Sequence, residues 1–478
     1  MTDEQQTLKR PALAALGALV LLLLGAVVFF KERVLFGDAS FILFNIIEYK
    51  RFYIQEHRFG SFITQLVPVL GQKLHVPMRA LLIGYSMSFN LFYLAVASFL
   101  VFGLRRYMFA ILMSLYYFLF VTDSYFWTNN ELHQAVAWMF LFFGAASYLN
   151  TDKSNSFGLV FVCLVLAFLT VYTHFVVVIP TLFLWIYFMI GNIRWRFSNT
   201  IALLLSVLLV VIIATKYMLS ATQSYDGKVL HDATHFSIKD IIHSVDTPVI
   251  RMFVKRCFTI YWPALIVFAL GIYSLIKTKQ KKLLYWSLLS IAGYFLIMGL
   301  TYGKEDGSIA LFHIESEWAP IGILMATPFV CSFLPGLKTN QMLVLLCLIF
   351  SIRIGYIAAS VAKFKWRNDI KKEVFAKMKR KGITKLAIYN NSTIQKKLVL
   401  DWAIPEESIL ESAMYREQPQ LTFRFVNPDD TALLRGIKAP SSISISFDML
   451  VPKNLNFDYF EIDTTRPYVV MTYDELFK

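Results

Sequence analysis

The sequence predicts an α-helical polytopic membrane protein with about eleven transmembrane helices and a small C-terminal α/β domain. Composition is the first reason: of 478 residues, 57% are hydrophobic and only 16% are charged, and the mean hydropathy is +0.56. The second reason is that apolar runs of roughly twenty residues, long enough to cross a bilayer, recur throughout residues 1–362. The third is that residues 363–478 have the mixed composition of a soluble domain.

The predicted spans are apolar runs separated by polar or basic loops. The first run is about twenty residues long and lacks a small-x-small cleavage site, so we interpret it as a retained anchor and not as a signal peptide. The spans are placed near residues 11–30, 80–103, 107–121, 132–149, 157–173, 175–191, 199–219, 259–276, 283–301, 319–335 and 341–362.

The basic residues predict an orientation for these spans. Short loops such as those with Arg105 and Lys277 are basic, as the positive-inside bias requires when the N-terminus is cytoplasmic. The formal net charge of +14 is thereby assigned to topology and not to nucleic-acid binding. An odd number of spans makes the C-terminal domain extracytoplasmic. The membrane in which we expect the protein is the cytoplasmic (inner) membrane. The long outer loops are then 31–79, 220–258 and 302–318.

Helical and strand-like patterns alternate within residues 363–478, which is typical of a small α/β domain. The stretch NDIKKEVFAKMKRKG has a helical pattern and ends at Gly382, a favourable helix stop. A second helix is expected over STIQKKLVLDWA, residues 392–403. Strands are expected over KLAIY (385–389), LTFRFV (421–426), SISISF (442–447) and FDYFEID (457–463).

Asp38 follows the first span, in the stretch GDAS. Its ordinary interpretation is a helix cap, because GDAS before FILFNII is typical of a helix start. Its functional interpretation is a general base, since a carboxylate at the outer end of a span is placed to deprotonate an acceptor hydroxyl. The two roles are compatible, and both stay open here.

Basic residues in two outer loops are candidates for binding a donor phosphate. HRFGS supplies His57 and Arg58, and RMFVKRCFTIYW supplies Lys255 and Arg256. A guanidinium suits a lipid phosphate or pyrophosphate, while anchoring to lipid headgroups is the alternative for cations at a membrane surface. The aromatic-rich segments that flank HRFGS have apolar faces, and we expect them to lie flat in the interface.

Acidic and histidine side chains in two further stretches are candidates for lining the site. In TDSYFWTNNELHQ, Glu131 and His133 begin a predicted span, where ionisable side chains usually face a cavity. In GKEDGSIALFHIESEW, His313 and Glu315 alternate on an extended stretch, so one face can present both. A divalent cation, Mg or Mn, would suit Glu131 and His133 together with Asp38 or Glu315.

These features share one layout: a cytoplasmic N-terminus, many spans, an acid directly after the first span, a long first outer loop and an extracytoplasmic C-terminal domain. Over residues 1–362 this layout resembles the GT-C superfamily of membrane glycosyltransferases, which includes protein O-mannosyltransferases, aminoarabinose transferases and oligosaccharyltransferases. Many members carry an Asp-x-Asp signature in the first loop, where this chain has the single acid of GDAS.

The resemblance implies an enzyme that takes a sugar from a polyprenyl-phosphate-linked donor on the extracytoplasmic face. The acceptor would be a hydroxyl of a protein, lipid or glycan, and Asp38 would be the general base. As the anomeric bond breaks, negative charge grows on the lipid phosphate, and Arg58, Lys255 and Arg256 would stabilise it. Membrane lipids are further expected partners, and nucleic acid is not.

Three alternatives stay open. An oligosaccharyltransferase, polysaccharide polymerase or ligase would use a polyprenyl-pyrophosphate-linked glycan and share the donor chemistry. A secondary transporter would be expected to place charged or broken spans near the bilayer midplane, whereas the ionisable residues here collect at one surface. A non-catalytic membrane scaffold would tolerate Asp38→Asn.

Overall fold

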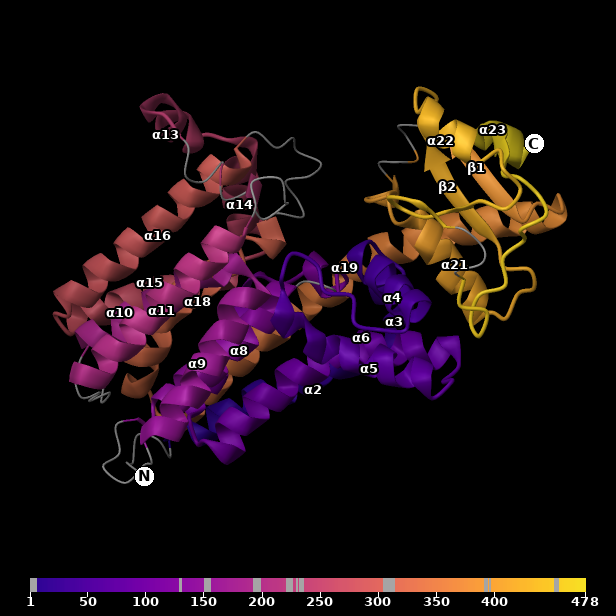
Figure 1. The fold of residues 1–478 in the computed structure, drawn as a ribbon. Coiled ribbons are helices and arrows are strands. Elements are labelled where there is room, and N and C mark those ends of the chain that lie inside the picture. Colours follow the sequence, from indigo (N-terminus) through magenta and orange to yellow (C-terminus); the bar gives the residue numbers. More distant parts are fainter. Residues whose placement is uncertain are drawn as a thin grey trace.

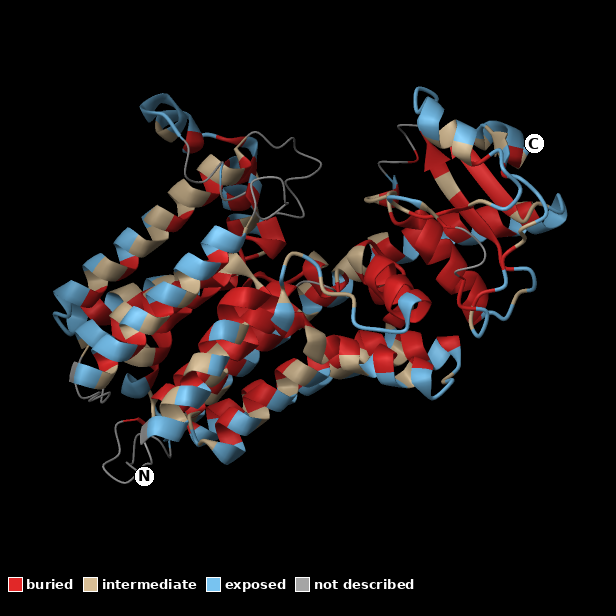
Figure 2. Cartoon of the chain, in the orientation of Figure 1, coloured by how far each residue is buried: buried red, intermediate tan, exposed pale blue. Residues whose placement is uncertain are grey.

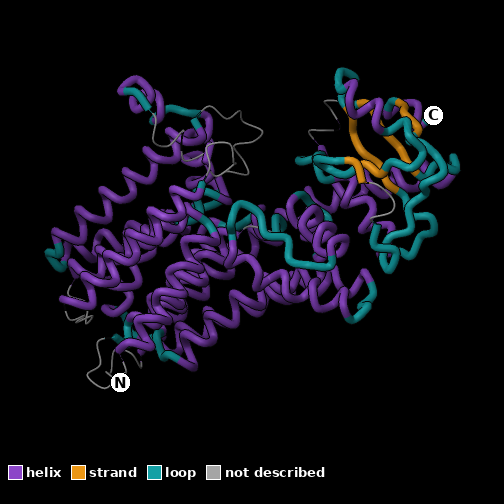
Figure 3. Tube along the Cα trace, viewed as in Figure 1, coloured by secondary structure: helices purple, strands orange, loops and turns teal. Residues whose placement is uncertain are grey.

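The structure, a computed structural model, describes residues 7–128, 131–149, 156–191, 199–220, 227–228, 231, 236–303, 314–390, 394, 397–450 and 455–478. A large helical part is followed by a C-terminal domain that contains all the described strands (Figures 1 and 3). The prediction of a helical protein with a small C-terminal sheet is confirmed.

The helical part consists of helices joined by short turns. Two of these turns carry residues of interest, η1 (Phe59–Ser61) and η3 (Asp123–Tyr125). The helices are α2 (Lys9–Val28), α3 (Phe30–Val34), α4 (Asp38–Tyr49), α5 (Phe62–Lys73), α6 (Met78–Ser98), α7 (Tyr107–Phe120), α8 (Glu131–Ala146), α9 (Ser156–Thr173), α10 (Val178–Gly191), α11 (Asn199–Leu219), α13 (Ile238–Ser244), α14 (Pro248–Thr259), α15 (Trp262–Lys277), α16 (Lys281–Tyr302), α18 (Ile321–Pro328) and α19 (Thr339–Arg380).

Fewer helices can span a membrane than the sequence predicts. Among the described residues, six helices are long and apolar enough, or up to seven if Ile238–Thr259 and Trp262–Lys277, which meet at a bend of 84°, form one span. The prediction of eleven spans is therefore wrong. The six are Lys9–Val28, Met78–Gly103, Thr200–Leu219, Lys281–Tyr302, Ile314–Gly336 and Thr339–Arg380.

Short apolar helices account for most of the difference. Tyr107–Phe120, Phe157–Thr173 and Phe175–Gly191 each have 10–17 residues, fewer than the roughly twenty that a bilayer core requires. The first of them, α7, is buried along almost its whole length and packs on α2, α8 and α18. A helix that is apolar all round occurs in a protein interior as well as in lipid, so hydropathy does not separate the two cases.

Burial differs strongly between central and peripheral helices. Inside the protein, 72% of the apolar segment of Ile314–Gly336 is buried, against 22% for Thr200–Leu219. Figure 2 shows the same contrast, with buried residues gathered at the centre of the helical part and exposed residues along α11 and α16. The outer helices therefore present apolar side chains, such as Leu203 and Val210, to their surroundings, as lipid-facing helices do.

The last long helix, α19, joins the two parts of the molecule. It runs without a break through residue 362, where we placed the domain boundary, and its final turns pack Val374 and Met378 against the sheet (Figure 1). It ends as predicted beside Gly382, whose φ of +64° is a left-handed backbone conformation that glycine adopts without strain. The Ile383 amide then donates to the Met378 carbonyl at 2.9 Å, which closes the helix end.

The C-terminal domain is built on a parallel three-stranded sheet in the order β2-β1-β5. The strands predicted at KLAIY and LTFRFV are confirmed as β1 and β2, and SISISF contributes the short β3. FDYFEID forms no strand and makes one isolated bridge, between Ile462 and Gln420. The elements are β1 (Lys385–Tyr389), α21 (Ile404–Met414), β2 (Thr422–Val426), α22 (Thr431–Gly436), β3 (Ile443–Ser444), β4 (Met449–Leu450), β5 (Val469–Met471) and α23 (Tyr473–Phe477).

One predicted helix of this domain lies partly outside the described residues. Of STIQKKLVLDWA, residues 392–393 and 395–396 lie outside them, Ile394, Lys397 and Leu398 are helical, and a separate helix, α21, begins at Ile404. Pro405 occupies the first turn of α21, a position where its missing amide hydrogen costs nothing. The sequence signal for this start is the proline, not the apolar run before it.

Helix α4 lies under the C-terminal domain. All of its residues from Ala39 to Glu48 are buried, and Phe44 packs with Ile409 and Phe460 in one apolar cluster. The expectation that both segments beside HRFGS lie flat in the membrane interface is therefore wrong for α4. The prediction failed because the apolar side of α4 is covered by the C-terminal domain, whose residues come some 370 positions later in the chain.

Candidate functional site

The turn between α7 and α8, residues 121–128, is the centre of the candidate site. Its Trp127 indole donates to Asp38 Oδ2 at 2.7 Å. Its Thr122 and Ser124 amides both donate to Glu315 Oε2, each at 2.8 Å. This one turn therefore connects side chains from the first loop and from the start of Ile314–Gly336.

Two buried arginines hold this turn in place. Arg353, inside α19, donates to the carbonyls of Phe118 at 2.6 Å and Val121 at 3.0 Å. These carbonyls belong to the end of α7, where helix carbonyls lack partners of their own. Arg33 donates to the Tyr125 carbonyl from the opposite side. The turn is thus fixed by charge-assisted hydrogen bonds from two distant helices.

Asp38, Arg58, Trp127 and Glu131 form what we term the Asp38 cluster. Asp38 is the first residue of α4, and the capping position belongs to Gly37, so the carboxylate is directed to Trp127 and not to the helix end. Arg58 Nη1 and Glu131 Oε2 are 3.0 Å apart, with side chains only 14% and 11% exposed. The structure therefore brings three of the predicted site residues together from segments far apart in the sequence.

The surroundings of Asp38 change its proton affinity. Burial is the largest effect and raises the pKa of Asp38 to about 6, and the nearby Glu131 carboxylate acts in the same direction. The hydrogen bond from Trp127 and the charge of Arg58 oppose the rise. Asp38 is thus ionised at neutral pH but has a pKa close to neutrality, the range that suits a general base.

Asp123, Arg256, Glu315 and Lys363 form a second group, the Glu315 cluster. Arg256 Nη1 lies 3.1 Å from Glu315 Oε1 and its Nη2 lies 3.5 Å from Asp123 Oδ2. Lys363 pairs with Asp123 as well. Two cations thus balance two carboxylates, and Arg256 is engaged by protein acids before any phosphate arrives.

Three other predicted phosphate or site-lining residues lie apart from these clusters. His57 is exposed, has a φ of +54° and has its ring 6.0 Å from that of Phe59. Lys255 is exposed on α14. His313 lies outside the described residues. The structure joins none of them to Asp38.

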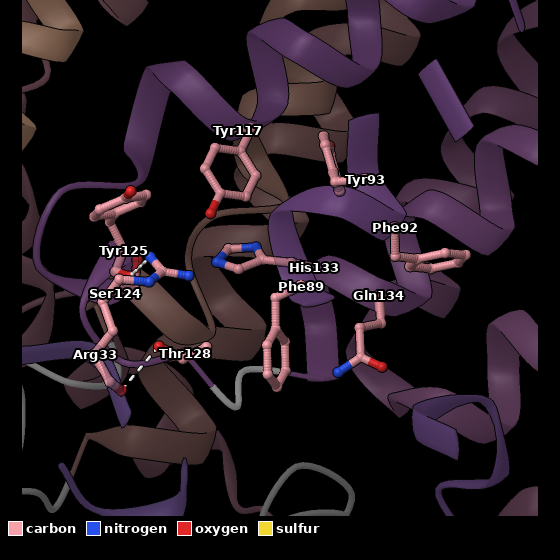
Figure 4. Close-up of a pocket in the computed structure, with 10 residues that line it drawn as sticks. All are labelled: Arg33, Phe89, Phe92, Tyr93, Tyr117, Ser124, Tyr125, Thr128, His133 and Gln134. Carbon is pink, nitrogen blue, oxygen red and sulfur yellow. Dashed lines mark hydrogen bonds between the residues drawn. The ribbon is translucent and has the colours of Figure 1, made fainter. Parts of the chain in front are cut away.

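His133 lies in an internal cavity of its own (Figure 4). Its Nδ1 is 2.8 Å from the Tyr116 hydroxyl, and Arg33, Tyr117 and Thr128 line the same space. The cavity offers about 10 Å³, room for roughly one water molecule. A sugar does not fit in a space of this size.

The predicted metal ligands are not gathered at one point. Asp38 and Glu131 belong to the Asp38 cluster, Glu315 binds Arg256 and backbone amides, and His133 faces its own cavity. Within the described ranges, no group of three or more His, Cys, Asp or Glu side chains is placed to hold a metal ion. The predicted donor set therefore does not fit Mg or Mn.

The sequence interpretation missed four residues that build the site: Arg33, Trp127, Arg353 and Lys363. Arg353 had a usable signal, because an ionisable residue within an apolar run is costly unless it has a structural or functional partner. Trp127 had none, since a tryptophan near a membrane surface is ordinarily read as part of the aromatic belt.

Comparison of the chain with family models, with curated proteins and with solved structures finds no match.

Proposed function

We propose that the protein is a membrane glycosyltransferase that moves a sugar from a polyprenyl-phosphate-linked donor to an acceptor hydroxyl, with Asp38 as general base. The observation that supports this most directly is the Asp38 cluster. It combines a half-buried carboxylate with a pKa of about 6, a tryptophan that fixes one of its oxygens, and a guanidinium close enough to act on its charge.

The proposed reaction uses the carboxylate and the guanidinium, and Trp127 holds the carboxylate in place. The acceptor hydroxyl loses its proton to Asp38 while its oxygen bonds to the anomeric carbon of the sugar. The bond between that carbon and the phosphate oxygen breaks, and its electron pair remains on the lipid phosphate. The negative charge that forms there needs a fixed cation nearby, and Arg58 is the cation that acts on Asp38.

Arg58 can serve this role although it already binds Glu131. A guanidinium carries five N–H donors in a planar fork, so one contact with Glu131 at 3.0 Å is compatible with further bonds to a phosphate. Glu131 then orients the fork, as second partners commonly do for arginines that bind anions. Arg256, held by Glu315 and Asp123, is a positioning residue in this scheme.

The test is mass spectrometry of polyprenyl-linked lipids in cells that lack the protein, complemented with wild type, Asp38→Asn or Asp369→Asn. Asp369 is an exposed aspartate on α19 that pairs with Lys372, so it is a matched control. We expect a polyprenyl-linked sugar to accumulate in the uncomplemented and Asp38→Asn cells only. An unchanged lipid pool in both would contradict the proposal and favour a transporter or scaffold.

The size of the accumulated glycan separates the two enzyme candidates. A single sugar on a phosphate supports the proposed transferase. An oligosaccharide on a pyrophosphate supports an oligosaccharyltransferase, polymerase or ligase, the alternative that shares the same donor chemistry.

The proposal includes an N-terminus in the cytoplasm and a C-terminal domain on the extracytoplasmic side. Seven spans put the two ends on opposite sides, and six put them on the same side, so the bent pair Ile238–Thr259 and Trp262–Lys277 decides the topology. An alkaline phosphatase fusion after Lys478 tests it, because that enzyme is active only outside the cytoplasm. We expect activity from this fusion and none from one placed in the loop after Lys277.

A further inference from the structure

A groove lies between the turn that joins α5 to α6 and the C-terminal domain. Its volume is about 730 Å³, within the range of ligand sites in proteins. In Figure 1, α5 and α6 lie below the C-terminal domain, and residues of both parts line the groove. The Tyr459 hydroxyl donates to the Val76 carbonyl at 3.0 Å, which ties one wall to the other.

Basic side chains line the groove from both sides. His75 lies in the α5–α6 turn, Arg79 lies in the first turn of α6, and Arg416 follows the end of α21. All three side chains are exposed. Among the described residues, neither Arg79 nor Arg416 has a carboxylate within ion-pair distance, so two guanidinium charges face the groove uncompensated.

The acids of the groove already have partners outside it. Asp458 Oδ2 lies 3.0 Å from Lys50 Nζ, and Glu417 pairs with Lys379. The hydrogen bond and charge of Lys50 keep the pKa of Asp458 below its ordinary value. Because both acids are paired with lysines, the guanidinium groups of Arg79 and Arg416 are the charges of the groove that favour an anion.

Apolar side chains continue the groove toward the membrane-spanning helices. Met78 and Ile83 of α6 and Met414 of α21 line it beside the arginines. Helix α6 begins the candidate span Met78–Gly103, so Arg79 lies at the end of a spanning helix, where such helices meet lipid headgroups. The nearby Leu74 side chain is 75% exposed, as suits a residue that contacts lipid.

We propose that this groove binds the phosphate headgroup of an anionic lipid, with Arg79 and Arg416 on the phosphate and an acyl chain along Met78, Ile83 and Met414. Two arginines from separate parts of the chain suit a phosphate better than single headgroup contacts do, because each guanidinium can bind two oxygens. Occupancy would fasten the C-terminal domain to the membrane surface. The inference does not depend on glycosyl transfer.

The experiment uses the purified full-length protein in a neutral detergent and follows its thermal unfolding with increasing ligand. The probes are dioctanoyl phosphatidic acid, dioctanoyl phosphatidylcholine and inorganic phosphate. A ligand that binds the folded state raises the unfolding temperature with its concentration. The variants are Arg79→Gln and Arg416→Gln, with Lys73→Gln as control, because Lys73 is an exposed cation at the end of α5 that does not line the groove.

We expect saturable stabilisation by phosphatidic acid, and binding about tenfold weaker in each arginine variant, since each loses one charge-assisted contact. Lys73→Gln should bind as wild type does. Equal stabilisation by inorganic phosphate would overturn the lipid assignment, and equal stabilisation by phosphatidylcholine would overturn the role of the phosphate charge. Wild-type binding by both arginine variants would overturn the site itself.

Discussion

Two groups of charged residues lie next to each other at the start of α4, and burial has opposite outcomes for the pKa of the central carboxylate in each. The Asp38 cluster is half-buried and begins at Asp38. The second group, which we term the Glu407 network, consists of Arg367, Lys371, Glu407 and Glu411 and binds the chain just before it. Arg367 and Lys371 each donate to the Leu35 carbonyl at 3.1 Å, and the Gly37 amide donates to Glu407 Oε1 at 3.1 Å.

The difference between them is how well each carboxylate is compensated. Glu407 receives two hydrogen bonds from Arg367, at 2.5 and 2.7 Å, and one from Lys371 at 3.0 Å. Burial pushes the pKa of Glu407 up, but these two cations outweigh it and leave the pKa below its ordinary value. Asp38 has no ion pair among the described residues, so burial prevails and its pKa rises.

The comparison separates a structural ionic group from a chemically responsive one. Glu407 stays charged, and its network joins α19, α21 and the chain just before Asp38. The Asp38 cluster keeps a carboxylate near its titration point beside a cation. Four measurements can sharpen or break this distinction, beginning with the largest expected effect.

Replacing Glu407 with Leu should cost about 3–5 kcal/mol of stability, because it leaves Arg367 and Lys371 buried without their anion. Thermal unfolding of the purified full-length protein measures the effect. The matched control is Asp369→Leu, which removes an exposed carboxylate from its pair with Lys372 and should cost less than about 1 kcal/mol. Equal losses in the two variants would mean that the Glu407 network contributes no more to stability than an exposed ion pair does.

The pH dependence of sugar transfer should report Asp38 directly. The pKa of Asp38 is raised to about 6, and the proposed reaction needs its ionised form, so the rate should fall about tenfold per pH unit below that value, or about a hundredfold by pH 4. The folded state also holds this proton more tightly than an unfolded aspartate with a pKa of 3.8. The contribution of Asp38 to stability is therefore favourable at low pH and is lost as pH rises from about 4 to 6.

Trp127→Phe should raise the pKa of Asp38 by about one unit, since the variant lacks the hydrogen bond that favours ionised Asp38. Infrared titration of protein labelled with ¹³C-aspartate follows the carboxyl group without requiring activity. Trp366→Phe is the control, because Trp366 is half exposed on α19 and distant in sequence from the cluster. A midpoint that does not move would show that Trp127 packs against Asp38 without tuning it.

Lys50→Ala should have the smallest effect, less than about 1 kcal/mol, because Lys50 and Asp458 form an exposed pair with side chains 55% and 46% exposed. This pair also joins the C-terminal domain to the first loop, so it is a direct counterpart to the Glu407 network. Thermal unfolding in low and in high salt is the measurement. A loss as large as that of Glu407→Leu would show that position at the domain interface, and not burial, determines the energy.

Several features of the protein followed from local pattern alone. The apolar runs predicted a helical protein with spanning helices, and β-branched and aromatic residues predicted the strands at Lys385–Tyr389 and Thr422–Val426. Gly382 predicted the end of α19. These are determined by residues within a few positions of each other, so periodicity and turn chemistry are sufficient to find them.

Only the tertiary structure decided which apolar helices are spans, what covers α4 and which charges pair. The apolar side chains of α7 are buried by protein, and composition cannot say whether protein or lipid surrounds a helix. Asp38 was a candidate from its position, yet its role depends on Trp127 and on residues 367–407, which lie far away in sequence. The physical reason is that a pattern encodes which faces are apolar or charged, while the partner of each face is chosen by contacts between distant segments.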